Sequence, residues 1–322
     1  MTTRCDDPAM SIRVSAIIPT FNRRAMVRQA IASVLAQRCR EFELIVVDDG
    51  STDRTCEDLE QLARDNSAMR IERLPENRGP AAARNRGVAI ARGEFVAFLD
   101  SDDLWMPAKL ARQLEFMDRR PELALSQCEE IWMRDGVRVN PGRRHRKRTG
   151  DFFVESLRTC LVSPSAAIIR RRIFEAAGGF DETLRAAEDY DLWLRLLLDQ
   201  ECGLLDEALV TRRAGHDDQL SEATPAIDRY RVVAILKLLT IARLGADRRC
   251  AAAEVLAEKC RIIALGLRRR SMIHLAEVYE RVAANALERW HTAYEESAFG
   301  ALAELRAALT MWCPNSATGA AA

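Results

Sequence analysis

The sequence lacks most features of secreted, membrane-spanning and nucleic-acid-binding proteins. Its nine cysteines include no Cys-x-x-Cys pair, so their spacing reveals neither a zinc site nor a disulfide framework. Lys and Arg together number 48 and Asp and Glu also number 48, so the chain has no excess of positive charge for binding nucleic acid. The first ten residues have no apolar core, so we expect no signal peptide there. The most apolar stretch, 232–244, is short and contains Lys237 and Arg243, which excludes a membrane span. We therefore expect a cytoplasmic protein with free thiols.

A regular alternation of apolar runs and amphipathic stretches occupies the first third of the chain. We expect strands at 14–18, 42–47, 69–74 and 95–99, separated by helices at 24–37, around Leu59 and Leu62, and at 81–91. This order predicts an α/β fold with a mostly parallel, Rossmann-like sheet flanked by helices.

The composition changes after Pro225. From Ile227 to Met311 the chain is rich in Ala, Leu, Arg and Glu, is almost free of Gly and Pro, and has a helical period. We predict an α/β domain at 12–223 and a C-terminal all-α helical bundle at 224–312. Residues 1–11 and 313–322 are expected to be flexible tails.

The run Phe95–Leu99 leads directly into Asp100, Ser101, Asp102 and Asp103. Open α/β sheets bind ligands at the carboxyl ends of their strands, and Mg²⁺ and Mn²⁺ prefer oxygen ligands. The simpler interpretation is a cap for a helix around 107–119, which needs only one acid. We expect Asp103 to be that cap and the other acids to form a metal site.

Four segments occur in a fixed order: 17–22 (IIPTFN), 46–53 (VVDDGSTD), 100–102 (DSD) and 187–193 (AEDYDLW). Together they resemble the family 2 inverting glycosyltransferases of the GT-A fold, and the resemblance covers about 14–221. It implies a nucleotide-diphospho-sugar donor, most often a UDP-sugar. It also implies transfer to an acceptor hydroxyl with inversion, assisted by Mn²⁺ or Mg²⁺.

The resemblance also assigns residues at these positions. The nucleotide-binding set is Pro19, Thr20, Asn22, Asp49, Arg84, Asp100 and Ser101. Asp49 corresponds to the acid that contacts the base, although one of Asp48 and Asp49 is expected to serve only a turn or helix cap. A solvated helix face is an equal alternative for Arg84.

The metal and base positions follow from the same resemblance. Asp102 corresponds to the metal-binding acid, with Asp100 beside it. His216, in a loop at 212–221 that resembles the one closing over the diphosphate, is a candidate third ligand, and an ordinary surface histidine is an equal alternative. Asp189, paired with Glu188, corresponds to the base that removes the acceptor proton. A helix N-terminus there would stabilise the carboxylate, whereas Asp191 is assigned only to the first helical turn.

Other functions fit the sequence less well. A dinucleotide-dependent oxidoreductase needs a Gly-x-Gly-x-x-Gly after the first strand, and none is present. A nucleotidyltransferase shares the carboxylate chemistry, but the acids at 188–189 favour transfer to a hydroxyl. A nucleotide-sugar-binding assembly protein with a weak or inactive transferase domain is the remaining alternative. The motif QxxRW of processive members is also missing, so we expect a non-processive enzyme.

The expected acceptor is a glycan, a lipid-linked molecule or a small molecule, in synthesis of a surface polysaccharide or related glycoconjugate. The basic run 143–148 lies where the family recognises acceptors, and it suits an anionic acceptor or membrane phosphates; a solvated, mobile loop is the simpler interpretation. Trp105 and Trp132 suit either sugar stacking or the core. Peripheral contact at the inner face of a membrane and self-association stay open.

Overall fold

The computed structural model describes residues 11–215, 227–241, 244–291 and 296–311. Internal contacts divide the chain into two units. The first comprises residues up to Asp151, Leu161–Thr183 and Gln200–Gly215; the second comprises Phe152–Cys160, Leu184–Asp199 and the chain after Gly215. Two short segments of the first 200 residues thus group with the C-terminal helices. The domain boundary at 223/224 stays a prediction.

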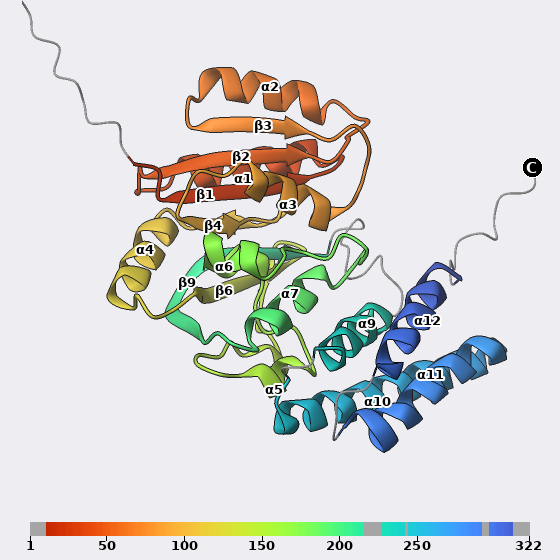
Figure 1. Ribbon diagram of the computed structural model, residues 1–322. Helices are drawn as coiled ribbons and strands as arrows, with labels where there is room; N and C mark the ends of the chain where they lie inside the picture. Colours follow the sequence, from red (N-terminus) through yellow and green to blue (C-terminus); the bar gives the residue numbers. More distant parts are fainter. Residues whose placement is uncertain (1–10, 216–226, 242–243, 292–295, 312–322) are drawn as a thin grey trace, which may run out of the picture. The chain divides into compact units, whose positions relative to one another are not determined.

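A mixed sheet forms the centre of the first unit (Figure 1). Four parallel strands lie in the order β3–β2–β1–β4, and the sheet continues through β8, β6, β9 and β5, with β7 paired to β6. The strand bounds are β1 Val14–Thr20, β2 Phe42–Asp48, β3 Met69–Arg73, β4 Phe95–Phe98, β5 Leu104–Trp105, β6 Leu125–Arg134, β7 Val137–Val139, β8 Ala167–Arg170 and β9 Cys202–Ala214. The predicted α/β class is confirmed, although β8 runs antiparallel to β4. Apolar runs at 123–131 and 165–169 overlap β6 and β8, whereas no sequence pattern indicated β5, β7 or β9.

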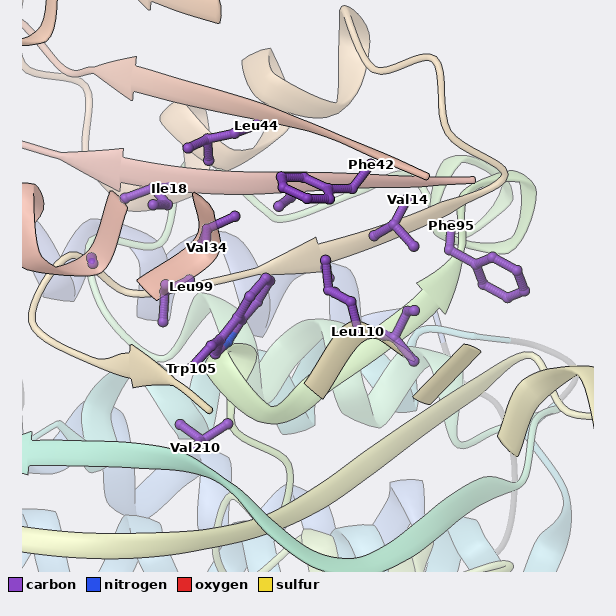
Figure 2. Close-up of a cluster of buried hydrophobic side chains, with 14 of the residues drawn as sticks. Val14, Ile18, Val34, Phe42, Leu44, Phe95, Leu99, Trp105, Leu110 and Val210 are labelled. Carbon is purple, nitrogen blue, oxygen red and sulfur yellow. The ribbon is translucent and has the colours of Figure 1, made fainter. Parts of the chain in front are cut away.

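Helices cover both faces of this sheet. They are α1 Arg24–Leu35, α2 Thr55–Asp65, α3 Pro80–Ala89, α4 Lys109–Arg119 and the short α6 Arg171–Ala176. Alternate residues of β1 point to opposite faces, so Val14 and Ile18 pack in one core with Val34 of α1 and Leu110 of α4 (Figure 2). On the other face α3 approaches closely, because a Cβ on Gly87 would lie 2.5 Å from Ile17.

A polar group is buried within the first core. Lys109 has no exposed surface; its Nζ donates to Gln113 Oε1 at 2.6 Å and lies 4.0 Å from the centre of the Trp105 ring. Gln113 Nε2 donates to the carbonyl of Ala166 at 3.0 Å, and Trp105 Nε1 donates to the carbonyl of Ser165 at 2.8 Å. These bonds fix the short turn before β8. Trp105 is therefore a core residue.

The second unit is helical. It contains α5 Phe153–Ser156, α7 Glu188–Leu196, α9 Asp228–Leu239, α10 Ala246–Arg269, α11 Ile273–Asn285, a π-helical turn at Ala286–Trp290 and α12 Ser297–Met311. The predicted C-terminal helical region is confirmed. Buried Arg249 donates to the carbonyls of Leu239 and Ile241. These carbonyls, at and just after the C-terminal end of α9, thereby gain hydrogen-bond donors. Within the described residues, no helix has the length and apolar character needed to cross a membrane.

The buried lysine leads to a prediction about stability. Burial lowers the pKa of Lys109 from 10.5 to about 8. Between these values the unfolded chain keeps a proton that the folded protein has released, so stability should rise with pH in that window. Lys109→Met should lack this rise, which is worth about 3 kcal/mol. Thermal melts from pH 7 to pH 10 measure the difference, and a constant gap between the two proteins would contradict it.

Candidate functional site

The acid-tipped strand predicted from the sequence is present at the end of β4. One carboxylate oxygen from each of Asp100, Asp102 and Asp103 lies within 4.8 Å of the others. The parallel neighbours β1 and β2 end at the same edge, since Thr20 lies in register with Asp48. The carboxyl edge of the sheet therefore brings together the three N-terminal segments of the motif set.

Asp103 has a different role from the one we predicted. Helix α4 begins six residues later, after Ala108, without a side-chain cap, so Asp103 does not cap it. Its carboxylate is buried and accepts hydrogen bonds from Ser165 Oγ at 2.6 Å and from the Arg213 N–H at 2.9 Å. Burial raises the pKa of Asp103 well above its usual value, and the charges of Asp102 and Asp100 add to this. Asp103 therefore joins the turn before β8, and β9, to the end of β4.

Ser165 connects two of the acids. Its hydroxyl donates to Asp103 and accepts the backbone N–H of Asp100 at 3.1 Å. The serine is fully buried, in the turn whose carbonyls accept hydrogen bonds from the side chains of Trp105 and Gln113. No sequence pattern identified Ser165, because it lies more than 60 residues from its partners and belongs to no motif.

Two arginines balance the remaining acids. Arg23 Nη1 lies 2.8 Å from Asp102 Oδ2, and Arg84 Nη2 lies 2.6 Å from Asp100 Oδ1. Arg84 is 5% exposed and its guanidinium lies 5.3 Å from the centre of the Phe180 ring, so the solvated helix face considered for it is wrong. Arg23, just before α1, was not predicted at all.

The donor set suits a hard divalent cation. Asp100 and Asp102 are both partly exposed and close together, and carboxylate oxygens are the ligands that Mg²⁺ and Mn²⁺ prefer. Asp103 suits it less, because both its oxygens already accept hydrogen bonds in the core. The predicted third ligand, His216, lies outside the described residues.

The loops after β1 and β2 are joined by hydrogen bonds. Asn22 has a positive φ of 51°, its N–H donates to Ser51 Oγ at 2.9 Å, and its Oδ1 accepts the N–H of Thr52 at 2.8 Å. Pro19 and Thr20 are buried in the last residues of β1. Ser101 is also buried, 3.4 Å from Arg23 Nη1. The predicted nucleotide-binding residues of β1, β2 and β4 thus share one edge.

Asp49 holds the loop that precedes α3. Its two carboxylate oxygens accept the backbone N–H groups of Arg78 and Gly79, at 2.9 and 2.8 Å. Burial raises the pKa of Asp49, and these two hydrogen bonds oppose the rise. Because α3 carries Arg84, Asp49 also helps to position the arginine that pairs with Asp100. Its predicted contact with a base stays a prediction.

The predicted base lies at the start of α7, in the second unit. Asp189 is half-buried; its Oδ1 accepts the N–H of Tyr190 at 2.7 Å, and Cys160 Sγ lies 3.5 Å from its Oδ2. Glu188 is 6% exposed. Cys160 was missed, because a lone cysteine carries no signal for such a contact.

Buried contacts fix α7 within the second unit. Asp191, assigned from sequence only to the first helical turn, is buried and pairs with Arg195 at 2.8 Å and with Lys237 of α9 at 2.6 Å. The Tyr190 hydroxyl donates to the carbonyl of Leu157 at 2.6 Å. Asp191 is therefore a structural residue that ties α7 to the C-terminal helices.

The basic run and the residues near 212 take up definite positions. Arg212 and Arg213 belong to β9 rather than to a loop, while 216–221 lie outside the described residues. The guanidinium of Arg213 bonds the Asp102 carbonyl and the Gln29 side chain. Lys147 is buried and lies 3.5 Å from Glu130, so the basic run is not a wholly solvated loop.

Comparison with known proteins gives consistent results. The model of the family described as glycosyl transferase family 2 matches residues 15–178. A putative teichuronic acid biosynthesis glycosyltransferase, TuaG of Bacillus subtilis, is 45% identical over 185 residues, covering 57% of this chain and 71% of TuaG. An uncharacterized glycosyltransferase of Rickettsia typhi is 32% identical over 240 residues, covering 70% and 72%. The chain spans only 32% of the length of another such relative, from Rickettsia felis.

Solved structures share the fold. Staphylococcus aureus TarS 1–349 in complex with UDP-GlcNAc superposes with a TM-score of 0.67 at 24% identity, covering 92% of this chain and 88% of that one. The mannosyltransferase PcManGT of Pyrobaculum calidifontis, in complex with GDP-Man and Mn²⁺, gives a TM-score of 0.56 at 21% identity, covering 96% and 83%.

Replacing Ser165 tests the bridge between the acids. Ser165→Ala leaves a buried carboxylate oxygen and the Asp100 N–H without their partner, which should cost roughly 1–3 kcal/mol of stability. Ser126→Ala is the matched control, since Ser126 is equally buried and its hydroxyl has no hydrogen-bond partner among the described residues. Urea unfolding of both variants makes the comparison, and equal losses would show that the bridge contributes nothing.

Proposed function

The chain belongs to glycosyl transferase family 2, and on that premise we propose that it transfers a sugar from a nucleotide-diphospho-sugar, in particular a UDP-sugar, to an acceptor hydroxyl with inversion. The observation that carries this proposal is the pair of partly exposed acids, Asp100 and Asp102, at the carboxyl edge of the sheet. The presence of UDP-GlcNAc in a TarS complex and of GDP-Man with Mn²⁺ in a PcManGT complex supports this class of donor.

We propose that Asp102 and Asp100 hold Mn²⁺ or Mg²⁺, with His216 as a third ligand. The cation would stabilise the negative charge that develops on the departing nucleoside diphosphate. Arg84 and Arg23 keep the two acids in place before the donor binds. Both arginines are also cations that can attract the phosphates of the donor.

The nucleotide is proposed to lie along the edge formed by β1, β2 and β4. Its partners would be Pro19, Thr20, Asn22, Asp49 and Ser101, together with Asp100 and Arg84. Hydrogen bonds between backbone N–H groups and side-chain oxygens of the β1 and β2 loops fix the shape of this edge before the ligand arrives, which lowers the entropic cost of binding.

Inversion needs a base that removes the proton of the attacking hydroxyl, and we assign this role to Asp189, with Glu188 beside it. Its carboxylate is partly exposed and oriented by the N–H of Tyr190, so a free lone pair can accept the proton. Asp191 of the same helix is less suited, because it is buried and already neutralised by two cations.

The acceptor is proposed to be a glycan or lipid-linked molecule in the synthesis of a surface polysaccharide, by analogy with the name of TuaG. We place the reaction in the cytoplasm with peripheral contact to the inner face of the membrane.

A panel of nucleotide-sugars with Mn²⁺ tests the proposal directly. The protein should slowly hydrolyse its correct donor in the absence of acceptor, and EDTA should stop the reaction. Binding of UDP without hydrolysis of any donor would instead identify a nucleotide-sugar-binding protein without transferase activity.

Asp102→Asn tests the metal role. The amide keeps the shape of the side chain but removes a charged ligand, so donor turnover should fall roughly a hundredfold or more. Calorimetry with UDP and Mn²⁺ should also show weaker binding. Asp118→Asn is the matched control, since Asp118 likewise pairs with an arginine, Arg13, but is exposed at the end of α4. Wild-type turnover in Asp102→Asn would refute the assignment.

Asp189→Asn tests the base. It should lower kcat for transfer roughly 10²- to 10⁴-fold while leaving the affinity for UDP nearly unchanged, because the residue acts on the acceptor proton. Glu188→Gln provides the comparison within the same helical turn. A large loss in Glu188→Gln with normal transfer by Asp189→Asn would move the role to Glu188.

A further inference from the structure

One stretch of this chain departs sharply from the overall balance of charge. Residues 131–150 contain seven Lys and Arg residues and a single acid, Asp135, whereas the whole chain has equal numbers of both. The stretch includes the end of β6, all of β7 and the loop that follows. Such a local excess attracts an anionic partner even when the net charge of the protein is zero.

The stretch folds as a β-hairpin followed by a loop. β6 and β7 are joined by Asp135 and Gly136, both with positive φ (50° and 76°), as a two-residue hairpin turn requires. Every residue of β7 is exposed, and β7 pairs only with β6 in the described sheet. The following loop is tethered rather than free, because Lys147 Nζ donates to Gln127 at 3.1 Å and Gln127 Nε2 donates to the carbonyl of Arg148 at 3.1 Å.

Most exposed arginines of this hairpin lack an acidic partner. Most exposed arginines elsewhere in the unit do pair with acids, for example Arg24 with Asp58 and Arg86 with Glu72. By contrast, five exposed arginines of the hairpin and its loop make no ion pair with any described residue: Arg138, Arg143, Arg144, Arg146 and Arg148. These cations stay available for a partner outside the chain.

Apolar side chains lie among these cations. Val137 is 66% exposed and Val139 is 36% exposed, which is unusual for β-branched residues in a strand. Val139 lies opposite Trp132 across the hairpin, so both are on one face. Trp132 is itself half-buried, with Arg212 at 4.7 Å and His145 at 5.4 Å from its ring centre.

We propose that this basic hairpin, residues 131–148, docks the protein on an anionic phospholipid bilayer. The arginines would bind lipid phosphates, while Val137 and Val139 enter the apolar boundary below the headgroups. A soluble anionic glycan would satisfy the arginines but would leave the exposed valines without a partner. The inference rests on the peripheral contact proposed above and not on sugar transfer, so the two can fail separately.

Vesicle co-sedimentation of the full chain tests the proposal without any nucleotide. The protein should sediment with vesicles of equal parts phosphatidylcholine and phosphatidylglycerol, and much less with phosphatidylcholine alone. An arginine near an anionic surface strengthens binding about fivefold. The double variant Arg143→Gln/Arg144→Gln should therefore bind roughly 25-fold more weakly, and Val137→Ser several-fold more weakly. Added salt should weaken wild-type binding.

Matched variants keep the result specific. Arg119→Gln/Arg120→Gln makes the same change of charge on exposed residues of α4 and its end, and it should bind like the wild type. Donor hydrolysis and circular dichroism should be unchanged in all three variants. Equal binding to both kinds of vesicle, or an equal loss in the control, would overturn the proposal. Binding to soluble polygalacturonate without binding to vesicles would overturn it too, and would assign the hairpin to an anionic acceptor.

Discussion

The first unit depends on holding three mutually repelling carboxylates together at the end of one strand. Oxygens of Asp100, Asp102 and Asp103 lie within 4.8 Å of one another. Arg84 and Arg23 compensate two of the charges, and burial raises the pKa of the third. The negative charge of each acid is thus compensated in a different way. Only Asp100 and Asp102, which pair with arginines, keep exposed surface for a ligand.

The hydrogen bonds that support buried Asp103 continue into the core. Ser165 can bridge Asp103 and Asp100 only while its turn stays in place, and that turn is held by Trp105 and by Gln113. Gln113 is in turn bonded by the buried Lys109. A lysine without exposed surface is costly, and polar networks of this kind stay rigid when every member has a partner. Its place in this network accounts for the buried lysine, Lys109, whose burial is otherwise unfavourable.

Local sequence signals predicted the parts of this site that are local. The apolar runs of β1, β2 and β4 and the acids that follow them lie within single segments, so the strand ends and their common edge could be inferred. The residues that complete the site could not, because Arg23 and Asp102 are 79 residues apart and Arg213 and Asp103 are 110 apart. Asp103 was assigned to a cap for the same reason: its real partners are remote, and a nearby helix offered a simple explanation.

The helix α7 shows how one turn can give similar acids different roles. Successive residues of a helix point in directions about 100° apart, so neighbouring acids face different surroundings. Asp191 points into the second unit, where Lys237 and Arg195 neutralise it, and Tyr190 bonds the carbonyl of Leu157. These contacts fix the rotation of α7 about its axis, which leaves Asp189 partly exposed and oriented by a backbone N–H. The C-terminal helices therefore determine which acid of the motif faces outward, although they contain none of the motifs themselves.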